Sequence, residues 1–153
     1  MPSPSYFEDF QVGTIQEFGE YEVTVDEIID FAEKFDPQPF HLSEEAGQAM
    51  HFGGLCASGW HTCSMAMRMI VDHMPKENNG ALGSPGIDEI RWKKPVFPGD
   101  VLRMRSTILD KKPSMSRADM GTIFMLNELF NQNDEVVMTN KPIVMVKKRS
   151  NIS

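Results

Sequence analysis

The spacing of apolar positions predicts helices in the first half of the chain. Between residues 24 and 35, apolar side chains recur every three or four positions, which is the period of one helix face. Thr24 and Glu27 have the spacing of a capping box at the start of this helix, and Pro37 ends it. A longer helical pattern covers residues 58 to about 74 and is apolar on nearly all sides, so we expect that helix to be buried.

The second half of the chain has the two-residue period of β-strands. The predicted strands cover residues 86–93, 101–109, 120–130 and 135–146. A helical half followed by a run of antiparallel strands is an α+β pattern. The simplest arrangement is a curved antiparallel sheet wrapped around the long central helix that begins near Ser58.

Composition and charge narrow the class of protein. With 153 residues, 41% of them hydrophobic, we expect residues 1–153 to form a single domain with a substantial core. A formal charge of −7 and a pI near 5.0 disfavour nucleic acid and anionic lipid as partners. The sequence has no apolar run of membrane-spanning length and no secretion signal at its start, so we expect a cytoplasmic protein.

The cysteines and histidines do not form a pattern typical of a disulfide or a metal site. Cys56 and Cys63 are poorly placed to pair, because Cys63 falls within the predicted helix. The four histidines are scattered and lack neighbouring ligand-type residues, which argues against a zinc site. Methionines crowd the same helix, which is typical of an adaptable core element.

The loop from Asp36 to His41 carries the strongest signal for chemistry. Pro37 and Pro39 each fix a φ angle and bias the residue before them to an extended conformation, so the loop is stiff. Asp36 follows one helix and His41 precedes the next, so both side chains can project toward a common water. An imidazole titrates near neutrality, and an adjacent carboxylate can orient it or share its proton. The alternative is that both side chains only satisfy backbone groups in a turn.

The glycine-rich segment that opens the long helix is a second candidate. Backbone N–H groups at a helix start are unpaired and lie at the positive end of the helix dipole, so they can bind a developing oxyanion. Gly59 would allow a substrate carbonyl to approach closely. In the alternative interpretation, Ser58 is an ordinary N-cap and Gly59 a packing residue.

Several segments resemble, in order and spacing, the MaoC-like dehydratases and (R)-specific enoyl-CoA hydratases. They are Asp36-Pro37-Gln38-Pro39-Phe40-His41, Phe52-Gly53, Ala57-Ser58-Gly59 and residues 91–100 (RWKKPVFPGD). The similarity covers residues 5 to 147. It implies a hot-dog fold, in which a sheet curls around a central helix, and a homodimer with acyl sites near the subunit interface.

The resemblance also implies an activity, the reversible hydration of a 2-enoyl-CoA to a 3-hydroxyacyl-CoA in fatty acid metabolism. Asp36 and His41 would activate one water together, and the Gly59 N–H would bind the thioester oxygen. An acid/base pair on one side needs an oxyanion donor opposite, because the intermediate is enolate-like. The thioester would be carried by coenzyme A or acyl carrier protein, and neither a metal nor an organic cofactor is required.

Residues for substrate binding follow from the same resemblance. The candidates for the acyl pocket are Phe52, Gly53, Ser58, Trp60 and Met67. The candidates for the coenzyme phosphates are Arg91, Lys93 and Lys94, whose alternative is a set of solvated charges at a strand end. The sequence departs from the common family pattern at Gln38, Ser58 and Met67, where Asn, His and Ser respectively are often found.

Two other functions remain open. A hot-dog thioesterase commonly uses a carboxylate on or near the central helix, but residues 58–70 contain no Asp or Glu. A non-catalytic acyl-binding subunit is also compatible with the fold, because fold does not fix function. The intact Asp36 and His41 pair favours the hydratase.

Overall fold

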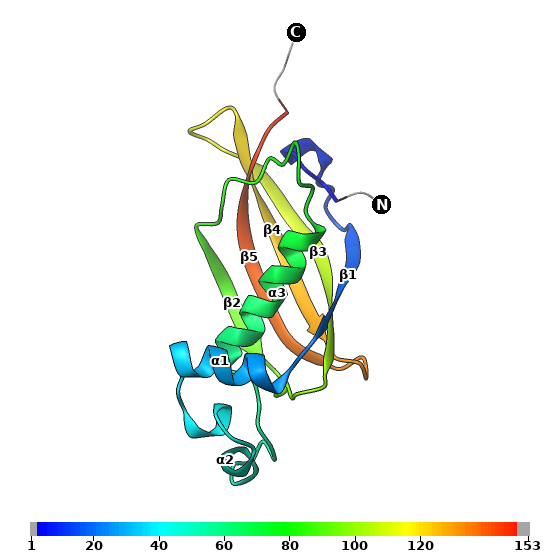
Figure 1. Cartoon of the computed structure of the whole chain (residues 1–153). Helices are drawn as coiled ribbons and strands as arrows, with labels where there is room; N and C mark the ends of the chain where they lie inside the picture. Colours follow the sequence, from blue (N-terminus) through cyan, green and yellow to red (C-terminus); the bar gives the residue numbers. More distant parts are fainter. Residues whose placement is uncertain (1–2, 150–153) are drawn as a thin grey trace.

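The computed structural model describes residues 3–149 and follows the predicted order of helices before strands, with one further strand at the front (Figure 1). The helices are α1 (Val25–Phe35), α2 (Glu44–Gln48) and α3 (Gly59–His73), with short 3-10 turns η1 (Phe7–Asp9) and η2 (Pro39–His41). The strands are β1 (Ile15–Glu22), β2 (Gly86–Trp92), β3 (Val101–Pro113), β4 (Met120–Phe130) and β5 (Val136–Lys147).

The strands form a five-stranded sheet in the order β1-β3-β4-β5-β2, and every neighbouring pair is antiparallel. Figure 1 shows α3 lying across one face of the sheet, with α1 and α2 at the end where α3 begins. The expected α+β arrangement is therefore confirmed. The helix α3 has 15 residues, near the average for globular proteins, so it is not the long helix we expected. Within residues 3–149, no helix has the length and apolar character needed to cross a membrane.

The start of α1 forms only half of the predicted capping box. The Thr24 hydroxyl accepts a hydrogen bond from the Glu27 N–H at 3.2 Å, as the spacing predicted. The Glu27 carboxylate does not return to Thr24 but accepts a hydrogen bond from the Tyr21 hydroxyl of β1. Glu27 thus ties α1 to the sheet, and Asp36 stands at the other end of the helix as its C-cap.

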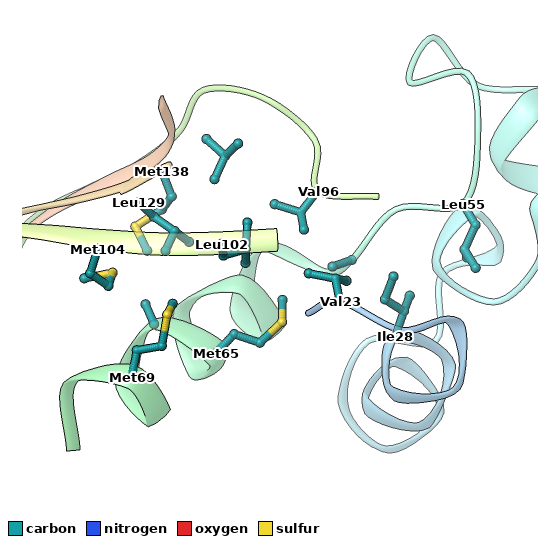
Figure 2. Close-up of a cluster of buried hydrophobic side chains, with 13 residues drawn as sticks. Val23, Ile28, Leu55, Met65, Met69, Val96, Leu102, Met104, Leu129 and Met138 are labelled. Atoms are coloured by element: carbon teal, nitrogen blue, oxygen red, sulfur yellow. The ribbon is translucent and has the colours of Figure 1, made fainter. Parts of the chain in front are cut away.

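The main core lies between the sheet and one face of α3 (Figure 2). Met65 and Met69 project from α3 into a cluster that includes Leu102, Met104 and Leu129 from the sheet, and all five side chains are buried. Burying each such side chain stabilises the fold by about 1.5–3 kcal/mol. The prediction of a methionine-rich core helix is confirmed for this face.

The opposite face of α3 is open, so the prediction that the helix is buried on nearly all sides is wrong. Trp60, Met67 and Val71 are 59%, 55% and 53% exposed. One sheet covers only one side of a helix, and the elements described here place nothing over the other. The apolar residues on that side form an exposed row, which we call the outer face of α3.

Strand β1 was not predicted, because a glycine breaks its alternation of apolar and polar residues. Gly19 has a φ of +88°, and the pairing register with β3 shifts between Phe18 and Tyr21. A Cβ on Gly19 would lie 2.6 Å from the sulfur of Met69. The β-bulge therefore lets the edge strand pass close to α3. It also interrupts the two-residue period by which a strand is recognised in a sequence.

Candidate functional site

Asp36 and His41 lie at opposite ends of the stiff loop between α1 and α2. The N–H of Gln38 donates to the Asp36 carbonyl at 2.8 Å, and the N–H of His41 donates to the Gln38 carbonyl at 2.9 Å. These bonds and the two prolines close the loop into the turn η2. Both side chains line a cavity of about 480 Å³ beside the start of α3.

The predicted pair is brought together by the structure. His41 Nε2 lies 3.4 Å from Asp36 Oδ2, and the two side chains are 7% and 18% exposed. His41 Nδ1 lies 2.6 Å from the backbone carbonyl of Cys56. Because a carbonyl oxygen can only accept, Nδ1 carries a proton, and Nε2 is the nitrogen left to exchange a proton with a bound molecule.

Both oxygens of the Asp36 carboxylate accept hydrogen bonds. Ser58 Oγ donates to Oδ2 at 2.7 Å, and Gln38 Nε2 donates to Oδ1 at 2.7 Å. Burial raises the pKa of Asp36, but these two bonds and the charge interaction with His41 outweigh it, so the pKa lies below its ordinary value of 3.8. The group is therefore a carboxylate, able to accept protons in hydrogen bonds and to stabilise a positive charge on His41.

The structure corrects both earlier interpretations of Ser58. Ser58 precedes α3 but makes no side-chain cap hydrogen bond, since its hydroxyl turns to Asp36 instead. The side chain is fully buried and does not line the cavity, so the predicted contact with substrate is not supported. Ser58 instead connects the start of α3 to the end of α1.

Gly59 is the first residue of α3 and lines the cavity. Its N–H has no hydrogen-bond partner within residues 3–149, as expected for the first position of a helix. The structure gives a further reason for glycine here, because a Cβ would lie 2.6 Å from Cε2 of Trp92. The Trp92 indole also donates from Nε1 to the Gly59 carbonyl at 2.9 Å.

Four predicted binding residues line the cavity: Phe52, Trp60, Lys93 and Lys94. Trp60 packs against Trp92 with ring centroids 5.5 Å apart in an edge-on arrangement. Lys94 pairs with Glu135, whereas Lys93 has no ion-pair partner among the described residues. Of the lysines at this site, Lys93 is thus the one whose charge is available to a ligand.

Three predicted binding residues lie outside the cavity lining. Met67 is seven residues beyond Trp60, two turns along the outer face of α3. It is therefore too far from the start of α3 to line the cavity. Arg91 points away from the cavity, because successive strand residues point to opposite faces and Trp92 lines the cavity. Its guanidinium pairs with Glu89 on the surface. Gly53 is next to a lining residue but does not contribute to the wall.

Sequence reasoning missed several contributors to the site. Trp92 was present in a quoted motif, and the alternation of β2 could have placed it opposite Arg91. Gln38 was noted only as a departure from the common family pattern, although its amide donates to the Asp36 carboxylate. The Cys56 carbonyl that orients His41 has no side-chain signal, so no sequence pattern could have identified it.

Cys56 and Cys63 are both free thiols, as the spacing predicted. The described part of the chain contains no cluster of three or more His, Cys, Asp or Glu residues with the geometry to hold a metal ion.

Comparisons with known proteins find several that are similar to this chain. The family model of the MaoC like domain matches residues 9–122. The structure of a MaoC-like dehydratase from Rhodospirillum rubrum is 38% identical, with a TM-score of 0.89, and the match covers 96% of this chain and 99% of that one. A mesaconyl-CoA hydratase from Cereibacter sphaeroides is 38% identical over 76 residues, which is 50% of this chain but only 22% of the relative.

The fold is identified by a more distant structure. Rv0216 from Mycobacterium tuberculosis, described as having a double hotdog fold, is 14% identical with a TM-score of 0.76. The match covers 97% of this chain and 46% of that one. The chain therefore has the hot-dog fold and spans about half of a chain built from two such units.

Proposed function

Because the chain belongs to the MaoC-like domain family, we propose that it is a hydro-lyase that reversibly hydrates a 2-enoyl thioester to a 3-hydroxyacyl thioester. The observation that carries the proposal is the His41–Asp36 pair, 3.4 Å apart in the wall of a cavity that Gly59 also lines. The activity named for the C. sphaeroides relative supports the same reaction class.

The pair is suited to activate one water. His41 Nε2 and Asp36 Oδ2 are both hydrogen-bond acceptors in this state, and a water between them would donate to each. As the water oxygen bonds to C3 of the substrate, His41 takes a proton and Asp36 stabilises the imidazolium. The imidazolium then returns a proton to C2 from the same side, so the net change is addition of one water.

The opposite side of the reaction would be stabilised by the start of α3. Negative charge develops on the thioester oxygen as C3 is attacked, and the unpartnered Gly59 N–H is a donor for that oxygen. The helix dipole adds a favourable positive potential at the same position. The aromatic side chains of Phe52 and Trp60 would contact the acyl chain, and Lys93 would meet a phosphate of the carrier, coenzyme A or acyl carrier protein.

A thioesterase is less well supported. Such an enzyme would need a carboxylate on or near the central helix, aimed at the thioester carbonyl, whereas Asp36, the carboxylate beside the start of α3, faces His41. The part of α3 that lines the cavity contributes Gly59, Trp60 and Thr62. The first carboxylate of the helix, Asp72, lies near its far end and pairs with Arg68.

The experiment that tests the proposal is a hydration screen over enoyl-CoA esters of graded length and branching. Loss of the enoyl absorbance reports hydration, and a thiol reagent in a parallel sample reports release of coenzyme A. We expect hydration without thiol release for at least one ester. Thiol release alone would indicate a thioesterase, and binding without either change would indicate a non-catalytic acyl-binding protein.

We further propose that the chain forms a homodimer. The outer face of α3 leaves the apolar side chains of Trp60, Met67 and Val71 in solvent, and β1 and β2 are open sheet edges. A second copy would cover such surfaces. The relation to a double hot-dog chain is consistent with two units working side by side.

A further inference from the structure

The two oxygens of Asp36 are held by side chains from different parts of the chain. We propose that Ser58 and Gln38 are positioning residues that fix the Asp36 carboxylate so that Oδ2 faces His41 Nε2; this rests on the function proposed above. Neither residue exchanges a proton with the substrate. Their role is to set the orientation and the ionised state of the carboxylate that stabilises His41.

The geometry restricts rotation of the carboxylate. An aspartate normally turns easily about its last side-chain bond, because that torsion has a broad preference. Here Oδ2 is bonded to Ser58 and Oδ1 to Gln38, both at 2.7 Å, so a turn would break both bonds. Ser58 is fully buried at the start of α3, and this gives one of the two anchors a rigid base.

The hydrogen bond from Ser58 to Asp36 replaces a helix cap, and this loss of helix stabilisation points to a functional role. A serine before a helix usually accepts a hydrogen bond from an N–H of the first turn, which stabilises a helix by about 1 kcal/mol. In α3 that bond is absent, and the hydroxyl donates to Asp36 instead. The first turn of α3 thus forgoes its side-chain cap, and Asp36 gains a hydrogen bond at the reacting pair.

The expected signature is a change in how Asp36 titrates. Hydrogen bonds donated to a carboxylate favour its charged form, so removing either donor raises the pKa of Asp36. His41 from η2 is the titratable group that faces this carboxylate, and Ser58 and Gln38 are both uncharged. The midpoint of the Asp36 titration should therefore move to higher pH in variants that lack a donor.

The test compares Ser58→Ala and Gln38→Met with the parent in two measurements. The first is the pH dependence of kcat and KM on the best thioester from the screen. The second is the carbon NMR titration of the Asp36 carboxyl, assigned with Asp36→Asn, which needs no substrate. We expect a lower kcat by about ten- to a hundredfold, little change of KM for Ser58→Ala, and an Asp36 midpoint at higher pH in both variants. Ser58→Thr, which keeps the hydroxyl, should restore the midpoint.

Matched controls separate positioning from loss of stability. Ser106→Ala removes another buried hydroxyl that donates to a side chain, Asn127, and Gln48→Met removes another amide that donates to a carboxylate, Glu44. Neither should move the Asp36 midpoint. If Ser58→Ala does not fold, Gln38→Met carries the test alone, because Gln38 is exposed.

An unchanged Asp36 midpoint in folded variants would overturn the inference. If the midpoint moves but the parent hydrates no thioester, the positioning of Asp36 stands and the proposed reaction is wrong.

Discussion

His41 is held in one tautomer by a backbone carbonyl, and this decides what the residue can do. The Cys56 carbonyl fixes the proton on Nδ1, which leaves Nε2 beside Asp36. A ring held in place by this hydrogen bond does not need to reorient when a proton moves at Nε2. The same arrangement means that His41 contributes to the stability of the loop as well as to the proposed chemistry.

We expect Asp36→Asn and His41→Ala each to lower hydration by about a hundredfold or more, the scale of a positioned acid/base group. His41→Ala should also lose about 1–3 kcal/mol of stability, because the buried Cys56 carbonyl loses its partner. Steady-state rates and thermal midpoints measure the two effects. Asp30→Asn, an exposed carboxylate on the same helix, serves as control, and near-normal turnover in either site variant would remove that residue from the mechanism.

The candidate pair could be predicted from the sequence because its two residues are close together along the chain and the two prolines between them make the loop stiff. The role of Ser58 could not, because the local preference of a serine before a helix is to cap it, and a tertiary contact overrides that preference. Met67 was misplaced for a related reason. Helix periodicity places it on the same side as Trp60 but says nothing of how far along α3 the cavity extends.

At the scale of elements, the start of α3 and strand β2 are fitted to one another. Trp92 occupies the space where any Gly59 side chain would lie, so Gly59→Ala must displace the indole and break its bond to the Gly59 carbonyl. Ser58, the residue before it, has φ −55° and ψ 142°, a conformation that permits a following proline. The first helical position also tolerates proline.

This fit makes a direct test of the oxyanion donor possible. In a Trp92→Ala background, Gly59→Ala keeps the N–H and Gly59→Pro removes it, without the collision in either case. We expect the proline variant to hydrate about a hundredfold or more slower than the alanine variant at similar helix content by far-UV dichroism. Equal rates in the two would place the oxyanion donor elsewhere. With Trp92 intact, Gly59→Ala should already lose stability.

The strands with a regular alternation of buried and exposed residues could be predicted, and the irregular strand could not. The alternation of β3 and β4 was read correctly, since buried and exposed positions follow the two-residue period. In β1 the bulge at Gly19 removes that period, and three glutamates among its residues resemble a surface loop. The order of the strands in the sheet depends on long-range pairing, which the periodicity of the single strands does not show.

At the scale of the whole molecule, the outer face of α3 should determine assembly. We expect a dimer, or an assembly of dimers, by light scattering at micromolar concentration. Met67→Lys and Val71→Glu should weaken it, because each places a charge among exposed apolar side chains. Lys76→Glu changes a charge beyond the end of α3, so it is a control for the effect of an altered net charge alone. A parent chain that remains an active monomer would contradict the prediction.

Stability of the whole fold should also depend on pH through His61. This side chain is buried against Phe31, and burial lowers the pKa of His61 from its ordinary 6.5, although the neighbouring Glu27 opposes the shift. A depressed histidine pKa means that the unfolded chain binds more protons, so stability falls as pH drops below about 6.5. We expect the thermal midpoint to decrease between pH 7 and 5, and to decrease less in His61→Gln. The same slope in both proteins would show that other groups dominate this pH range.

Trp60 and Trp92 are the two tryptophans of the chain, and both line the cavity beside Gly59. The long-wavelength ultraviolet emission of the molecule therefore originates at this one place. Both rings are about half exposed, so a ligand that enters the cavity displaces water from them and changes their surroundings. The chain thus carries its own optical reporter, and occupancy of the cavity can be followed by intrinsic fluorescence with unlabelled protein, even in variants that have lost all turnover.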